Sequence, residues 1–305
     1  MTVVLDGGLS TALAEVGFDL SHELWTARLI EENPAALTAA HQAFIEAGAE
    51  IVITASYQAS VAGFIRNGAT PSNAETLLQS TTALARLAVA QAGRSNVAVA
   101  ASVGPYGAVL ADGSEYRGDY AISRDELITF HRDRIGLLDA TEPDWWACET
   151  IPTAAEAVAI GTALRSMRTR PTWMTFTCRS GSETWGGDAI ETAVLAAINS
   201  TDLEAVGVNC TAPQFVPELL GRIQRVTNLP LVAYPNSGQT WDVVNKVFLG
   251  ERGVGTVAAL IDAGASFVGG CCGVGPAELA EIARIARSSR LTIKPSSRSG
   301  RTAQP

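Results

Sequence analysis

The sequence predicts an α/β fold, a single (β/α)8 TIM barrel, from two observations. Eight short β-rich runs alternate with longer amphipathic helical stretches over 305 residues. Most of these runs are continuously apolar, which is typical of parallel strands covered on both faces. Eight such β-then-α units in series favour a closed barrel over an open doubly wound sheet. The predicted strands are Val3–Asp6, Glu50–Ser56, Val97–Val103, Asp144–Thr150, Thr172–Cys178, Ala205–Cys210, Leu231–Asn236 and Ser266–Cys271.

Start and stop signals define the helices between these strands. Asn33–Ala47 has Pro34 near its start, and Gly48 stands where a terminating glycine belongs. Three segments fit the capping box, in which the first and fourth residues satisfy each other's amides: Ser72–Glu75, Ser123–Glu126 and Thr153–Glu156. The remaining predicted helices are Asp188–Ser200, Pro213–Val226, Val254–Ala263 and Ala277–Ser288. No dinucleotide-binding glycine fingerprint follows the first strand, which counts against the open sheet.

No linker or change in composition divides the chain, so residues 1–293 are predicted to form one barrel domain. The polar residues 294–305 are predicted to be a disordered tail. The longest irregular segment, Gly104–Ala121, follows the third strand and contains three tyrosines that could form a lid over the barrel mouth. Surface loops of that length often need no functional explanation, so both interpretations stay open.

Charge and composition narrow the possible functions. The formal net charge of −9 and a sequence pI near 4.9 disfavour binding to nucleic acid or anionic lipid. Only Lys246 and Lys294 among the 22 basic residues are lysine, which disfavours Schiff-base chemistry. Neither a signal peptide nor a membrane-spanning run is found, so a cytoplasmic location is expected. In that reducing compartment, metal binding or reactivity is expected of the five cysteines rather than disulfide pairing.

Reactive side chains stand at the carboxyl ends of several predicted strands, which share one mouth in a barrel. Asp6 ends the first strand, Glu149 the fourth and Cys210 the sixth, and Cys271-Cys272 follow at the eighth. Strands six and eight are next-nearest neighbours, so their ends can reach one ion. Zinc prefers thiolates, and three protein ligands leave a fourth position for water or substrate. The alternative is that Cys271 and Cys272 are small buried hydrophobes.

Other residues at these ends have two interpretations. Asp6-Gly7-Gly8 could present a carboxylate and two open amides to an amino acid, or form a tight turn. Glu149 lies in an apolar strand and must be paired or bind a ligand, because burying a lone charge is too costly. Cys148 and Cys178 are expected to belong to the hydrophobic core rather than to the site. Trp25 and Tyr57 could form the wall of a pocket, although aromatic residues more often belong to the core.

Seven motifs in this order resemble the homocysteine S-methyltransferase family over nearly the whole chain. They are Leu5-Asp-Gly-Gly8, Thr54-Ala-Ser-Tyr57, Ser102-Val-Gly-Pro-Tyr-Gly107, Cys148-Glu-Thr150, Gly207-Val-Asn-Cys210, Tyr234-Pro-Asn-Ser-Gly238 and Gly269-Gly-Cys-Cys-Gly273. The three cysteines in their two contexts are the most specific part. The stretch from Ser102 to Tyr116 is similar to the branch that uses S-methylmethionine.

The resemblance implies a zinc-dependent S-methyltransferase in which Cys210, Cys271 and Cys272 bind the metal. It also implies that Asp6 and Glu149 hold the homocysteine amino group. The residues implied near the homocysteine carboxylate and as aromatic walls are Gly7, Gly8, Trp25 and Tyr57. Many members have a histidine shortly after the cysteine doublet, whereas this chain reads Gly273-Val-Gly-Pro-Ala-Glu278.

The implied reaction transfers a methyl group from a sulfonium donor, S-methylmethionine, to homocysteine and yields methionine. The partners are therefore these small molecules, with no nucleic acid and no membrane. One alternative is the same barrel with betaine or S-adenosylmethionine as donor, or selenocysteine as acceptor. The other is a non-catalytic barrel that binds zinc or thiols. No feature of the sequence indicates an oligomeric state.

Overall fold

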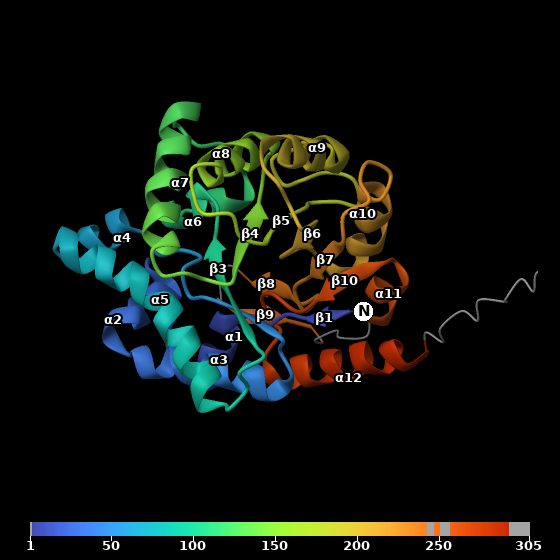
Figure 1. The fold of residues 1–305 in the computed structure, drawn as a ribbon, viewed down its shortest axis with the longest axis horizontal. Helices are drawn as coiled ribbons and strands as arrows, with labels where there is room; N and C mark the ends of the chain where they lie inside the picture. The colour runs from blue at the N-terminus through green and yellow to red at the C-terminus, as the bar shows by residue number, and fades with distance from the viewer. Residues whose placement is uncertain (1, 243–246, 251–256, 293–305) are drawn as a thin grey trace, which may run out of the picture.

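The computed structural model describes residues 2–242, 247–250 and 257–292 and contains the predicted barrel (Figure 1). Its eight parallel strands pair in the order β1-β10-β7-β6-β5-β4-β3-β2. A parallel bridge between Leu5 and Ile51 joins the first and last strands of this order, so the sheet closes. The strands are β1 (Val3–Val4), β2 (Ile51–Ile53), β3 (Ala98–Val103), β4 (Trp145–Ile151), β5 (Thr172–Phe176), β6 (Ala205–Asn209), β7 (Leu231–Tyr234) and β10 (Ala265–Val268). The prediction of a closed (β/α)8 barrel is confirmed.

Helices surround the strands, as Figure 1 shows. They are α1 (Leu9–Glu15), α2 (Leu29–Glu32), α3 (Pro34–Ala47), α4 (Val61–Arg66), α5 (Pro71–Gln91), α6 (Tyr106–Leu110), α7 (Arg124–Asp139), α8 (Ala154–Leu164), α9 (Ile190–Ser200), α10 (Val216–Ile223), α11 (Val257–Asp262) and α12 (Pro276–Thr292). The described chain also contains three 3-10 turns: η1 (Trp25–Arg28), η2 (Ser114–Tyr116) and η3 (Pro213–Phe215). An antiparallel strand pair that was not predicted consists of β8 (Thr240–Asp242) and β9 (Val247–Leu249). No helix in the described ranges is long and apolar enough to cross a membrane. The predicted tail, Lys246 and Lys294 lie outside the described residues.

The three predicted capping boxes have different outcomes. The Ser123 box is confirmed, with its hydroxyl and the Glu126 carboxylate each binding the other's amide. Thr153 caps α8, but the Glu156 side chain turns away to other partners. The box at Ser72 is wrong: α5 begins at Pro71, and the Thr70 hydroxyl accepts the capping hydrogen bond. Proline suits the first position of a helix, where its missing N–H would be unpaired in any case. The helix α5 therefore begins at Pro71, before the predicted cap at Ser72.

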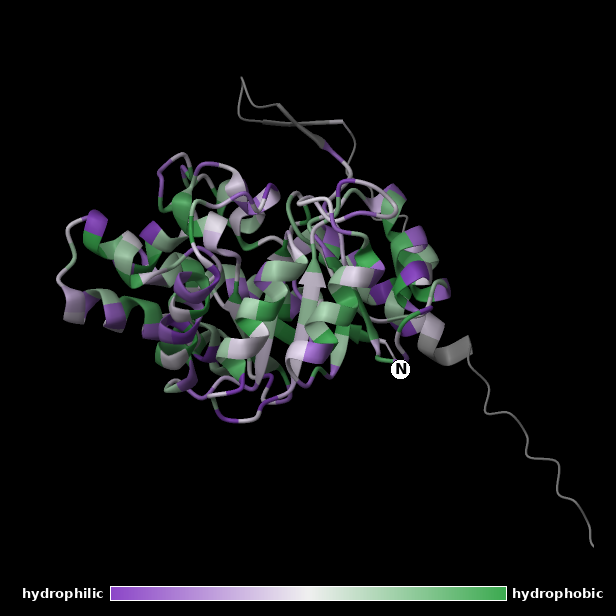
Figure 2. Cartoon of the chain, turned by 90° about the horizontal axis from the view of Figure 1, so that it is seen from above, coloured by the Kyte–Doolittle hydropathy of each residue, from purple (hydrophilic) through white to green (hydrophobic). Residues whose placement is uncertain are grey.

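Two hydrophobic layers hold the barrel together. The outer layer lies between strands and helices, and it includes Cys148 and Cys178, as expected for core cysteines. The inner layer fills the barrel around Leu5, Ile51, Ala100, Ala147, Trp173, Ala205, Val232 and Tyr234. In Figure 2 hydrophobic and neutral colours dominate the centre of the molecule, and the hydrophilic colour is most frequent on loops and helix ends at the periphery. Since adjacent residues of a strand point to opposite faces, Glu149 points inward where Cys148 points outward.

The two ends of the barrel interior differ in polarity. The rings of Trp145 and Trp173, near the amino ends of β4 and β5, and of Phe267 in β10 pack at centroid distances of 5.7 to 6.4 Å. These rings belong to the inner hydrophobic layer. Polar side chains, including Asp6 and Glu149, occupy the interior near the carboxyl ends. Among the described residues, the buried carboxylates of the barrel interior therefore lie at the end where barrel enzymes place their active sites.

His41 on α3 gives the fold a dependence on pH. It is fully buried, and neither ring nitrogen has a hydrogen-bond partner within the described chain. Burial lowers its pKa from 6.5 to about 4. The folded state therefore favours the neutral form of His41. Its free energy of unfolding is fully retained above pH 6.5 and decreases as the pH falls towards 4, because protonation of His41 favours the unfolded state. The difference amounts to about 3 kcal/mol of unfolding free energy.

Methionine is apolar and similar in volume to histidine. We therefore expect the His41→Met variant to lack the part of the acid-induced loss of unfolding free energy that comes from His41. Urea unfolding of both proteins between pH 7.5 and 4 measures it. The stability of the variant relative to the wild type should rise as the pH falls, because contributions from all other groups cancel in the difference. Parallel curves for the two proteins would contradict the prediction.

Candidate active site

The sulfur atoms of Cys210, Cys271 and Cys272 form a cluster at the mouth. All three lie within 4.8 Å of one another. The Sγ of Cys272 is 3.8 Å from that of Cys210 and 4.0 Å from that of Cys271. A zinc–sulfur distance of about 2.3 Å in tetrahedral geometry separates two sulfurs by about 3.8 Å. The three thiols therefore fit a tetrahedral metal site with one position left for another ligand.

The cluster is the only group of three metal-ligating side chains at such distances in the described part of the chain. Hydrogen bonding with Cys210 lowers the pKa of Cys272 and raises the pKa of Cys271. Cys178 also follows a strand but stays in the outer hydrophobic layer. The interpretation of Cys271 and Cys272 as two unrelated core residues is not supported, because both are only partly buried.

Backbone contacts with neighbouring strand ends place Cys210. Its φ of +45° is uncommon for a residue with a side chain. The Cys210 N–H donates to the Tyr234 carbonyl at 3.2 Å, and the Thr177 hydroxyl donates to the Cys210 carbonyl at 3.0 Å. Such conformations persist where surrounding contacts hold them and often occur at functional sites.

The cysteine doublet lies beyond its strand, because β10 ends at Val268 rather than at the predicted Cys271. Cys272 is in a turn. The Cys271 N–H donates to the Pro235 carbonyl at 2.8 Å, and the Cys272 carbonyl accepts from the Ser237 N–H at 2.9 Å. Leaving the strand removes the alternation that would point adjacent side chains to opposite faces, so both sulfurs reach the same cluster.

Asp6 and the two following glycines lie beside this turn. The Asp6 carboxylate is buried and accepts a hydrogen bond from the Ile53 N–H at 2.7 Å. Burial raises its pKa well above the ordinary value. A Cβ at Gly8 would lie 2.6 Å from the Cys271 carbonyl oxygen, so the close approach requires glycine. The possibility that both glycines present free backbone amides is wrong for Gly8, because the Gly8 N–H donates to the Val274 carbonyl at 2.9 Å.

Glu149 is buried and paired, as expected. The Ser102 hydroxyl donates to its Oε1 at 2.5 Å, and the Tyr234 hydroxyl donates to its Oε2 at 3.1 Å. Burial is the largest influence and raises the Glu149 pKa to about 7. Tyr234 was missed as a site residue, because the predicted strand ran on to Asn236 whereas β7 ends at Tyr234.

The segment Gly104–Ala121 is more ordered than the irregular loop expected from the sequence, since it contains α6 and η2. The Tyr116 hydroxyl lies 3.5 Å from the Cys210 sulfur, and the Tyr116 ring packs against Trp185 at 6.0 Å. Tyr106 and Tyr120 instead pack together, and Tyr106 also contacts Phe130. Of the three tyrosines, Tyr116 is thus the one that covers the cysteine cluster.

Trp25 begins η1, between β1 and β2, and Tyr57 follows β2. Their ring centroids are 6.5 Å apart. Both are partly exposed, as residues lining an opening would be. Arg134 of α7 donates hydrogen bonds to the carbonyls of Ser56, Tyr57 and Gly104, and these bonds fix the chain after β2 and β3. Sequence patterns gave no sign of this buried arginine, because charged helix residues are mostly exposed.

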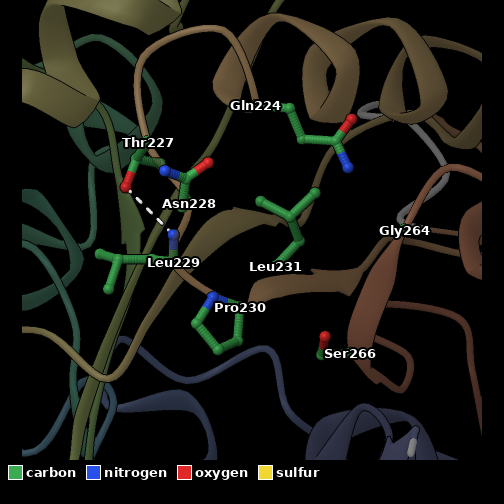
Figure 3. Close-up of a pocket in the computed structure, with 8 residues that line it drawn as sticks. All are labelled: Gln224, Thr227, Asn228, Leu229, Pro230, Leu231, Gly264 and Ser266. Carbon is green, nitrogen blue, oxygen red and sulfur yellow. Dashed lines mark hydrogen bonds between the residues drawn. The ribbon is translucent and has the colours of Figure 1, made fainter. Parts of the chain in front are cut away.

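A separate pocket of about 470 Å³ lies at the opposite end of the barrel (Figure 3). It lies near the amino ends of β7 and β10, where Leu231 and Ser266 are among its lining residues. Its lining contains no titratable or thiol side chain. The pocket is therefore not the place for the chemistry that the cysteine cluster offers.

Comparisons with known proteins agree with this site. The family model described as homocysteine S-methyltransferase matches residues 3–286. Homocysteine S-methyltransferase YbgG from Bacillus subtilis is 36% identical over 302 residues, which are 95% of this chain and 96% of the relative. Homocysteine S-methyltransferase 4 from Zea mays is 38% identical over 94% of this chain and 90% of its own.

Solved structures give the same result. The metallated form of the homocysteine methyltransferase MmuM from Escherichia coli has a TM-score of 0.81 at 36% identity. The match covers 94% of this chain and 96% of MmuM. The oxidised form of MmuM has a TM-score of 0.82. The sequence motifs, the barrel and both comparisons lead to one conclusion: this chain belongs to the homocysteine S-methyltransferase family.

Proposed function

We propose that this enzyme methylates the sulfur of homocysteine, with zinc held by Cys210, Cys271 and Cys272 and with S-methylmethionine as the methyl donor. The observation that carries the proposal is the spacing of the three sulfurs, which suits a tetrahedral ion with one open position. Three thiol ligands favour zinc over magnesium or calcium, which prefer oxygen. Zinc bound there supplies the acidity that turns a thiol ligand into a thiolate, the nucleophilic form.

The residues around the cluster would hold homocysteine in position. Asp6 and Glu149, both buried at the mouth, are the carboxylates for its ammonium group. The ammonium would stabilise the ionised form of Glu149, whose pKa is raised to about 7 in its absence. Gly7 and Gly8 would lie next to the substrate carboxylate. Because the Gly8 N–H is already engaged, the Gly7 amide is the better donor.

The methyl transfer is balanced without a general base. The homocysteine thiolate attacks a methyl carbon of the sulfonium in line, and a new carbon–sulfur bond forms. The old carbon–sulfur bond breaks, and its electron pair stays on the donor sulfur. Opposite charges are neutralised in this step, so a mouth that excludes water favours it. Trp25, Tyr57 and Tyr116 would provide the aromatic walls that exclude water.

Turnover tests the proposal directly. The zinc-loaded protein is incubated with deuterated homocysteine and S-methylmethionine, and mass spectrometry should find deuterated and unlabelled methionine in equal amounts. Parallel reactions with betaine or S-adenosylmethionine as donor, and with selenocysteine as acceptor, test the alternatives within the family. Zinc binding without turnover on any donor would instead identify a non-catalytic metal-binding barrel.

A further inference from the structure

A third carboxylate, Glu115, lies at the mouth and has no assigned role. It belongs to η2, next to Tyr116, whose hydroxyl contacts the Cys210 sulfur. Its Oε2 atom is buried and has no hydrogen-bond partner among the described residues. After burial, the Glu115 charge is the next influence that raises the pKa of Tyr57, so this carboxylate lies close enough to the Tyr57 hydroxyl to act on it electrostatically.

The segment that carries Glu115 is held from several sides. The Glu156 carboxylate accepts hydrogen bonds from the Tyr106 N–H at 2.6 Å and from the Tyr120 hydroxyl at 2.7 Å, so both ends of the segment are fixed to α8. A Cβ at Gly107 would lie 2.3 Å from the Glu115 nitrogen, so α6 packs directly against η2. A carboxylate held in this way is preorganised for a ligand.

The missing partner should be a cation with N–H groups. An ionised carboxylate only accepts hydrogen bonds. Glu115 is half-buried with its Oε2 atom unpaired, which disfavours its charged form until a donor binds. Neither nearby arginine forms a hydrogen bond with Glu115: Arg117, whose charge lowers the Glu115 pKa, pairs with Asp119 at 3.1 Å, and Arg134 donates to backbone carbonyls. A sulfonium centre has no N–H. The ammonium group of an amino-acid sulfonium has three.

We propose that Glu115 binds the α-ammonium group of the methyl donor and thereby selects amino-acid sulfoniums over simple sulfoniums. This inference rests on the proposed function, in which two amino acids meet at one mouth and need two ammonium sites. Asp6 and Glu149 serve the acceptor from inside the barrel. Glu115 serves the donor from the segment that covers the cysteine cluster.

The test compares two donors on the Glu115→Gln variant of the zinc-loaded enzyme. One donor is S-methylmethionine, and the other is (3-carboxypropyl)dimethylsulfonium, which is the same molecule without its amino group. The KM for S-methylmethionine should rise at least tenfold, whereas the KM for the des-amino donor, the KM for homocysteine and the zinc content stay unchanged. Asp125→Asn is the matched control, because it removes the same charge from an exposed position of α7, shortly after this segment, and should change none of these values.

Other outcomes would overturn the inference. An equal rise in KM for both donors would show that Glu115 acts on the sulfonium or on the segment as a whole. No change for either donor would show that it does not bind the donor. Calorimetric titration of S-methylmethionine into the protein without homocysteine gives a second readout, and the binding loss in the variant should match the rise in KM. A wild type that turns over neither donor would instead refute the proposed function.

Discussion

The Cys210→Ser variant is expected to lose its zinc and with it nearly all methyl transfer. In the proposed zinc site Cys210 joins the end of β6 to the doublet after β10, so its loss would leave two adjacent sulfurs and a weak hydroxyl ligand. Loss of a residue that only supports a metal ligand costs about 10–100-fold in affinity or activity, so loss of the ligand itself should cost on the order of 1,000-fold or more. Metal analysis after gel filtration and the rate of methionine formation measure the two effects.

Cys178→Ala is the matched control for this variant. Cys178 also follows a barrel strand and is buried, but it lies in the outer hydrophobic layer, outside the sulfur cluster. This control should keep full zinc content and activity. Full zinc occupancy in Cys210→Ser, or equal metal loss in both variants, would contradict a site built from the three clustered cysteines.

The fold should survive loss of the metal. The barrel has a continuous hydrophobic core inside and outside its strands, and a domain of this size does not need a metal to fold. Circular dichroism of the Cys210→Ser variant, and of wild type treated with a chelator, should therefore stay native. Unfolding on chelation would show that the zinc site is structural rather than catalytic.

Strand ends were the most informative feature of the sequence. β-rich runs, most of them continuously apolar, identified all eight barrel strands, because strands covered on both faces leave little room for polar residues. Once the runs are ordered in a barrel, their carboxyl ends must meet, so the proximity of Cys210 to the doublet follows from topology alone. The family resemblance then supplied the chemistry.

Contacts between side chains of different elements could not be predicted in this way. The pairing of Glu149 with Ser102 and Tyr234 joins three strands, and their register is not visible in a single sequence. Glu156 and Arg134 lie on helices, where charged residues are mostly exposed, yet both are buried and fix the loops of the mouth. Glu115 carried no signal of its own, because its importance depends on how α6 packs against η2.

The Glu149→Gln variant is expected to weaken homocysteine binding while leaving zinc in place. A charge-assisted hydrogen bond from the substrate ammonium contributes about 1.5–3 kcal/mol, which corresponds to a rise of about 10–150-fold in KM. Glutamine has the same shape, and the Ser102 hydroxyl can rotate to accept from its amide, so the variant should fold normally.

The choice of acceptor separates loss of ammonium binding from general damage to the mouth. With 4-mercaptobutanoate, which is homocysteine without its amino group, Glu149→Gln and wild type should be equally active. The variant should also keep its KM for S-methylmethionine, whereas Glu115→Gln should show the reverse pattern. If Glu149→Gln loses as much activity towards 4-mercaptobutanoate as towards homocysteine, Glu149 acts on the thiol or the metal rather than on the ammonium group.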